Sequence, residues 1–185
     1  LKKNWLNIIL TAVFLIGTSL LLYPTVSDYW NSFHQSQAIA KYAEEVALLD
    51  DGEVEKMFSD AHAYNQTLTT KNNRFQPTEE EADVYQNVLN ISNGVMGYIE
   101  IPIIKTSLPI YHGVDESVLQ VAVGHIPGTS LPVGGPGTHT VLSGHRGLPS
   151  AKLFTDLDQL VEGDIFIIRV ADEVMTYEVD QILVV

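Results

Sequence analysis

Residues 95–112 read VMGYIEIPIIKTSLPIYH, and this stretch decides the fold class of the chain. Two runs rich in β-branched and aromatic residues are separated by proline and polar residues, a pattern typical of consecutive strands. Similar runs follow as THTVLSG, DIFIIRV and VMTYEVDQILVV, with turns predicted at 163–164 and 171–173 between the last, antiparallel strands. We therefore predict a mainly β domain over residues 93–185, built as a barrel or sandwich.

Helices are predicted before this β-rich half. Apolar residues recur at helical spacing over Asp28–Leu49 and over about Glu53–Leu68. The polar stretch Thr67–Pro77 predicts a loop. Thr78 and Glu81 then have the spacing of a capping box, which predicts a short helix ending near residues 88–89. Brief helices within the β-rich half are predicted at Glu116–Val123 and Ser150–Leu160.

The N-terminal segment predicts a membrane span. Trp5–Tyr23 contains no charged residue and would extend roughly 28 Å as a helix. Lys2 and Lys3 precede it and an acidic flank follows, so the positive-inside rule places the rest of the chain outside the cytoplasm. A cleaved signal peptide is the alternative, but the residues after the apolar run are bulky. We interpret residues 1–27 as an uncleaved signal anchor and expect a cell-membrane location.

The composition excludes several classes of function. The formal net charge of −13 opposes nucleic-acid binding, because such proteins need a basic surface to displace counterions. The chain contains no cysteine, which excludes a disulfide framework and a cysteine-based zinc site. Its 6 histidines form no metal-binding spacing. We expect no metal and no other cofactor.

One histidine occupies an unusual setting. Residues 141–154 read VLSGHRGLPSAKLF, which places His145 between two glycines after an apolar strand-like run. Alternation along a strand would put Ser143 and His145 on the same face, with Arg146 facing away as a surface or loop-anchoring residue. On chemistry alone, His145 is either one member of a catalytic pair or an ordinary loop histidine.

Residues 94–185 resemble the class C sortases, the pilus-assembling transpeptidases of Gram-positive bacteria. The motifs GVMGYIEIP, LPIYHG, VGHIPGTSLPVGG, THTVLSGHRGLPSAKLFTDLDQL and YEVDQI carry the resemblance, in this order. In that family the histidine of the SGHRG segment is catalytic, and it matches His145. His125, in VGHIPGTS, belongs to a different family segment.

The resemblance implies a sortase-type β-barrel, incomplete here, behind a transmembrane helix and an N-terminal helical region. Residues 1–27 would be the anchor, 28–92 the helical region that holds any lid, and 93–185 the partial barrel. The domain would lie on the extracellular side of a Gram-positive cell, attached to the membrane by its N-terminal helix. Its partners would be pilin subunits with LPxTG-like sorting signals.

The implied chemistry is cysteine transpeptidation. A thiolate would cleave the sorting signal between Thr and Gly, and a pilin lysine amine would resolve the thioacyl enzyme, with the histidine chiefly a general acid. The family's cysteine segment and its late arginine would both lie beyond Val185, and the apolar ending DQILVV suggests a sequence cut short. We expect the chain as given to be inactive. Its arginines, Arg74, Arg146 and Arg169, do not match the family position.

Class C sortases often carry an Asp-Pro-aromatic lid motif, which this sequence does not contain. The loop Asn73–Pro77 is either a degenerate lid, with Phe75 as its plug, or an ordinarily packed loop. Three other functions are weighed. A housekeeping sortase is disfavoured by the GHRGLPSAKLF segment and the long N-terminal region. A serine hydrolase using Ser143 lacks a nucleophile elbow and an orienting acid. A non-catalytic, membrane-anchored peptide-binding module remains open.

Overall fold

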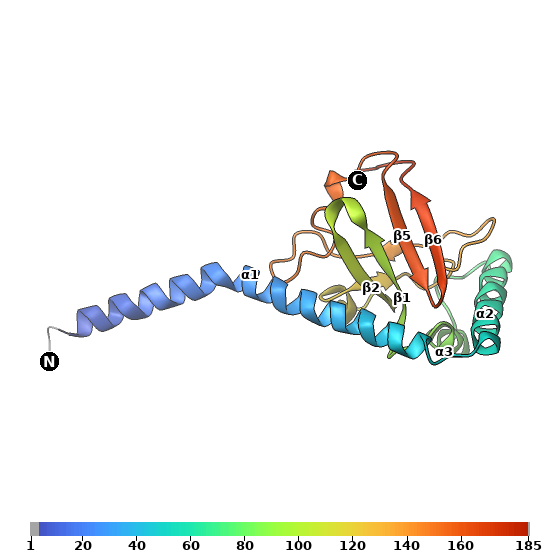
Figure 1. The fold of residues 1–185 in the computed structure, drawn as a ribbon, viewed down its shortest axis with the longest axis horizontal. Helices are drawn as coiled ribbons and strands as arrows, with labels where there is room; N and C mark the ends of the chain where they lie inside the picture. Colours follow the sequence, from blue (N-terminus) through green and yellow to red (C-terminus); the bar gives the residue numbers. More distant parts are fainter. Residues whose placement is uncertain (1–3, 185) are drawn as a thin grey trace.

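The structure, a computed structural model, describes residues 4–184. One long helix runs along a curved sheet, and two shorter helices lie at the end of the sheet farthest from the N-terminus (Figure 1). The helices are α1 (Trp5–Val46), α2 (Asp51–Thr70), α3 (Glu79–Asn87) and α4 (Glu116–Leu119), with two short 3-10 helices, η1 (Pro102–Ile104) and η2 (Leu157–Gln159). The strands are β1 (Val95–Ile101), β2 (Thr106–His112), β3 (Val123–His125), β4 (Leu142–Ser143), β5 (Ile165–Val170) and β6 (Glu173–Glu178).

The six strands form a half-barrel in the order β4-β3-β2-β1-β5-β6. Strands β2 and β3 are parallel, and all other neighbouring pairs are antiparallel. Central strand β1 pairs with both β2 and β5, placing Ile99 opposite Leu108 on one side and Ile168 on the other. All three side chains are buried and contribute apolar area to one core. The predicted mainly β domain of sortase type is confirmed.

Helix α1 is one continuous element. The sequence predicts a membrane span and a separate amphipathic helix after Pro24, yet the helix passes through this proline. Proline removes one main-chain donor, but the turns on both sides keep their own hydrogen bonds, so the helix continues with a bend (Figure 1). Within residues 4–184, α1 is the one helix long and apolar enough to cross a membrane.

Helices α2 and α3 are confirmed, α2 from its apolar spacing and α3 from its capping box, and both begin with a capping box in the structure. Asp50 accepts from the Glu53 amide and the Glu53 carboxylate accepts from the Asp50 amide, at 2.8 and 3.0 Å. Thr78 and Glu81 form the same reciprocal pair at the start of α3. These bonds satisfy amides that the first helical turn leaves free. Helix α2 extends to Thr70, so the loop after it is shorter than predicted.

Three predicted elements differ from the structure in whole or in part. Residues 150–160 form turns and the single 3-10 turn η2 instead of a helix, and Leu153 has a φ of 42°, outside the helical region. Strand β6 ends at Glu178, and residues 179–184 carry no strand. The Val179 carbonyl accepts from the Gly163 amide, and the Val179 amide donates to the Asp164 carbonyl. These two residues form the turn before β5, so the pairing of β6 with β5 stops there. Helix α4 also ends at Leu119, earlier than predicted.

Tyr42 joins α1 to the sheet. Its side chain is 1% exposed. Its hydroxyl donates to the Met96 carbonyl at 3.1 Å and accepts from the Ala171 amide at 2.8 Å. Burial raises the pKa of Tyr42 to about 12, so the hydroxyl stays neutral and keeps its proton to donate. One side chain therefore satisfies main-chain groups of β1 and of the β5–β6 turn.

His125 is a second buried polar group of the core, with 0% exposure. Its Nδ1 lies 3.0 Å from the Tyr85 hydroxyl, and its Nε2 lies 2.9 Å from the Ser130 carbonyl. Burial lowers the pKa of His125 to about 4, so the ring is neutral. In that state Nε2 donates to the Ser130 carbonyl, and the Tyr85 hydroxyl proton lies within reach of both Nδ1 and the His125 carbonyl, each at 3.0 Å. His125 is therefore a structural residue.

We predict that Tyr42→Phe lowers the free energy of unfolding by about 1–3 kcal/mol, because it leaves a buried carbonyl and a main-chain amide without partners. Urea denaturation in detergent solution measures the change. Tyr177→Phe is the matched control, because among residues 4–184 its hydroxyl makes a hydrogen bond only to the Met175 sulfur, at 3.8 Å, and a change within about 0.5 kcal/mol is expected. Equal stability of the two variants would contradict the role of Tyr42.

We predict that His125 makes stability depend on acid pH. Its pKa falls from an ordinary value of 6.5 to about 4 on folding, so the unfolded state binds more protons between these values. The free energy of unfolding therefore keeps its full value above pH 6.5. It decreases as the pH falls toward 4, by about 3 kcal/mol in total from this one group. For His125→Gln, the free energy of unfolding should change less with pH over this range than it does for the wild type. For His139→Gln, at an exposed position, the plot of unfolding free energy against pH should run parallel to that of the wild type. Parallel curves for both variants would refute this assignment.

Candidate active site

His145 lies just beyond the last residue of β4. The sequence analysis extends the strand through His145, but pairing with β3 ends at Ser143. At Gly144 the Phe154 ring covers the main chain so closely that an added Cβ would lie 2.7 Å from Phe154 Cδ2. The chain therefore leaves the sheet at a glycine, and the alternation of side chains does not carry over to His145.

The His145 ring is partly open and partly enclosed. Its side chain is 37% exposed, yet Nε2 is buried and makes no hydrogen bond to any residue in the range 4–184. The nearest acid is Glu116, the first residue of α4, whose Oε1 lies 3.9 Å from Nε2. This distance is too long for a hydrogen bond but allows attraction to a protonated ring, weakened by solvent because Glu116 is exposed. Nε2 is thus available to a further partner.

Residues 144–158, here named the histidine loop, are closed by bonds at their base. The His145 carbonyl accepts from the Phe154 amide at 3.1 Å. The Gly147 amide donates to Thr155 Oγ1 at 3.0 Å, and Arg146 forms an ion pair with Asp158 at 2.7 Å. Arg146 is thus a loop-anchoring residue, as predicted. Because these bonds cross the loop, the main chain at His145 is held from both sides.

The other residues considered in the sequence have different surroundings. His125 is the structural residue described above, and His112 is buried with both ring nitrogens facing main-chain carbonyls, at 3.0 and 2.7 Å. His139 is exposed. In the part of the chain that the structure describes, no hydrogen bond joins Ser143 to His145, so the geometry gives no support to a serine nucleophile.

The remaining arginines also have partners away from the histidine loop. Arg169 on β5 bonds through Nε to Glu100 on β1 at 3.1 Å, across two paired strands. The Arg74 guanidinium lies over the Phe75 ring, 5.0 Å from its centroid. This cation–π contact joins two neighbouring residues of the candidate lid.

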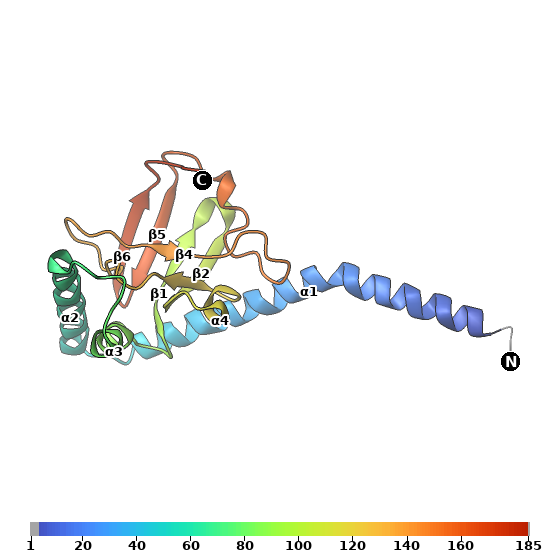
Figure 2. The same ribbon diagram turned by 180° about the vertical axis from the view of Figure 1, so that it is seen from behind.

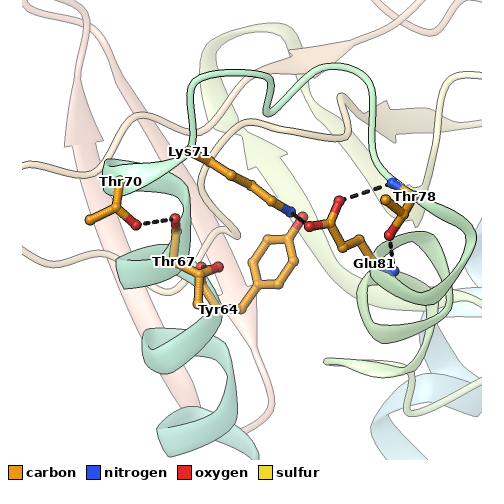
Figure 3. Close-up of polar contacts among 6 residues, drawn as sticks. All are labelled: Tyr64, Thr67, Thr70, Lys71, Thr78 and Glu81. Atoms are coloured by element: carbon orange, nitrogen blue, oxygen red, sulfur yellow. Dashed lines mark hydrogen bonds and ion pairs between the residues drawn. The ribbon is translucent and has the colours of Figure 1, made fainter.

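The candidate lid is tied at both ends (Figure 3). Lys71, two residues before the loop, pairs with Glu81, which also accepts from the amide of Thr78, directly after the loop, at 2.9 Å. Its main chain lies against Gly128 in the β3–β4 connection, where an added Cβ would fall 2.4 Å from the Arg74 carbonyl oxygen. Phe75 is 59% exposed, so its ring is not a buried plug.

A groove of about 1030 Å³ opens elsewhere, between the end of α1, α2 and α3. Met57, Tyr64 and Val88 are among its lining residues, and His145 is not. Its position separates it from the candidate chemistry, so we do not assign it to the active site.

Two features of the site escape sequence reasoning. Glu116 approaches His145 from α4, and Asp28 on α1 accepts from the Lys152 amide of the histidine loop at 2.8 Å. Both contacts join residues far apart along the chain, and no local pattern in the sequence predicts them. Only the position of Asp28, directly after the apolar span, could have drawn attention to it.

Comparison with known proteins finds one family model and several similar solved structures. The sortase domain family model matches residues 99–185. A comparison with curated proteins gives no match. Sortase C1 from Streptococcus agalactiae is 44% identical, over 78% of this chain and 76% of that chain, with a TM-score of 0.75.

Two further solved structures are similar. Sortase C from Streptococcus pneumoniae is 39% identical over 78% of this chain and 74% of its own, with a TM-score of 0.65. Sortase C-1 from Actinomyces oris is 40% identical over 69% of this chain and 74% of its own, with a TM-score of 0.63. Identity at this level, over most of each relative, shows that the chain belongs to the class C sortases.

Proposed function

We propose that this class C sortase is a membrane-anchored cysteine transpeptidase that polymerises pilins, with His145 as its general acid and base. The observation that carries the proposal is the buried Nε2 of His145, which has no hydrogen-bond partner among residues 4–184 and sits on a partly exposed ring. Such a nitrogen is suited to exchange a proton with a group that enters the site. The similar sortase C of Streptococcus pneumoniae is described in terms of its pilin substrate specificity.

The first half-reaction cleaves the sorting signal. A thiolate attacks the carbonyl carbon of the Thr–Gly bond, and a C–S bond forms as the C–N bond breaks. The imidazolium form of His145 gives its Nε2 proton to the departing glycine amine, which would otherwise leave as a poor anion. The products are a thioester and a free glycine amine, and the histidine is left neutral.

The second half-reaction joins two pilins. A lysine amine of the next subunit attacks the thioester carbonyl, and the C–S bond breaks as an isopeptide bond forms. Neutral His145 takes the proton that the amine releases, so the thiolate and the imidazolium are both regenerated. Glu116, at 3.9 Å from Nε2, attracts the protonated ring in each cycle.

Residues 1–185 contain no cysteine, so none of them can supply the thiolate. These residues by themselves should therefore form no isopeptide bond. Within them we propose an anchor over 1–27, a helical region with the candidate lid over 28–92, and part of the catalytic barrel over 93–185. The helix α1 would place the barrel on the outer face of a Gram-positive cell membrane.

Two alternatives make different predictions. A housekeeping sortase would use the same chemistry but transfer its substrate to a cell-wall amine instead of a pilin lysine. A non-catalytic module would bind a sorting signal without cleaving it, and the lack of cysteine in residues 1–185 favours this function for these residues alone. Product analysis separates the three, because only pilin transfer gives covalent pilin polymers.

We predict that His145→Ala in the protein from the complete gene lowers the rate of pilin polymerisation by about 10²–10⁴-fold, the usual contribution of a general acid and base. Formation of covalent polymers from purified pilin measures the rate. His139→Ala is the matched control, because it removes an exposed histidine outside the histidine loop, and its rate should equal that of the wild type. Undiminished polymerisation by His145→Ala would rule out the proposed role.

A further inference from the structure

Helix α1 contacts the histidine loop directly. Asp28 Oδ1 accepts from the Lys152 amide at 2.8 Å, and Asn31 Nδ2 donates to the Ser150 carbonyl at 2.7 Å. The two side chains are three positions apart, so they lie on the same face of the helix. Figures 1 and 2 both show the loop after β4 descending to α1.

Both contacts act on the main chain of the loop. A bond to a side chain would leave the main chain free to move, whereas bonds to Ser150 and Lys152 fix its path. The loop is also closed internally by the bond from the Phe154 amide to the His145 carbonyl, at 3.1 Å. The constraint imposed by α1 therefore reaches the histidine through only a few residues of ordered chain.

The same face of α1 also supports the other side of the site. Gln35, one turn further along, donates to the Val121 carbonyl at 2.8 Å. Val121 follows directly after α4 and its C-cap, and α4 carries Glu116 at its first position. Thus α1 holds both segments that meet at His145 Nε2.

Asp28 lies close to the membrane span. Asp28 is five positions after Tyr23, which corresponds to roughly 8 Å along the helix axis. Because α1 is continuous through this region, the bilayer and the histidine loop are attached to one helix. A rotation or tilt of the span would move the contacts at Asp28 and Asn31.

We propose that α1 is a positioning element for the active site, with Asp28 and Asn31 as positioning residues that hold the histidine loop and so place His145. This role rests on the proposed function of His145. Reactive groups must be held within a fraction of an ångström of the productive geometry, and a misplacement of about 1 Å lowers rates by up to about a hundredfold. Loops reach such accuracy only when more rigid elements hold them.

The test compares Asp28→Ala, Asn31→Ala and the double variant in the protein from the complete gene, reconstituted in nanodiscs. Asp28→Asn is the conservative variant, because its amide oxygen still accepts from Lys152. Ser36→Ala is the matched control on α1, because the exposed Ser36 hydroxyl donates to its own helix at Ser32. Two measurements are made: amide hydrogen exchange, and kcat and KM for pilin polymerisation.

The double variant should exchange about tenfold faster in peptides covering residues 144–158, with no change in residues 95–112. Its kcat should fall by about tenfold or more, with KM changed less than about twofold. The single variant Asp28→Asn should keep the exchange rate and kcat of the wild type, and so should Ser36→Ala.

Unchanged exchange in the histidine loop would overturn the proposal, whatever the activity. Faster exchange throughout the β domain would also overturn it, because the contacts would then support general stability only. Faster exchange in the loop with unchanged kcat would show that α1 holds the loop without placing His145. Failure of the proposed function gives a different result. In that case His145→Ala would remain active, while the hydrogen exchange of the histidine loop would still show whether α1 holds it.

Discussion

The arrangement of this protein depends on hydrogen bonds from one face of α1 to main-chain groups of the β domain. Asp28, Asn31, Gln35 and Tyr42 recur at helical spacing and each bonds to a main-chain atom far away in the sequence. The Met96 carbonyl bonded by Tyr42 is buried, and leaving such a group unpaired costs about 1–3 kcal/mol, whereas the exposed contact of Asp28 with Lys152 contributes less. These bonds favour one position of the helix on the sheet, and this position orients the β domain relative to the apolar N-terminal part of α1.

The order of the strands then places the site. The parallel pair β2–β3 requires a connection that crosses over, and α4 lies in this connection. Glu116 on α4 precedes β3, while His145 follows β4, the antiparallel neighbour of β3. The two residues meet at this edge of the half-barrel because their segments flank one short strand. Their separation of 3.9 Å gives the histidine a charged neighbour while leaving Nε2 without a hydrogen bond from it.

The two histidines His125 and His145 differ in burial and in the partners of their ring nitrogens. His125 is fully enclosed, both its nitrogens have partners, and desolvation lowers its pKa so far that it carries no charge at neutral pH. His145 differs in being partly exposed, with one nitrogen left unpartnered. The same residue type thus stabilises the core in one place and, within residues 4–184, presents a ring nitrogen without a hydrogen-bond partner in another.

Sequence reasoning succeeded where the decisive interactions are local. The capping box at Thr78 joins residues three positions apart, so the start of α3 was predicted, whereas α2 was predicted from its apolar spacing and its capping box at Asp50 was not recognised. It failed for residues 150–160, where apolar spacing suggested a helix. There Leu153, Phe154 and Leu160 are buried around a turn whose main chain bonds to His145, and that distant bond replaces the helical one.

By itself, the sequence predicted an apolar helix that could span a membrane, the start of α3, the β-rich half and the candidate histidine, because these follow from composition, short-range spacing and motif. The tertiary structure alone decided that α1 continues through Pro24 and holds the histidine loop, and that Glu116 approaches His145. These contacts join residues distant in the chain, and their energies depend on burial and geometry that exist only after the strands have paired.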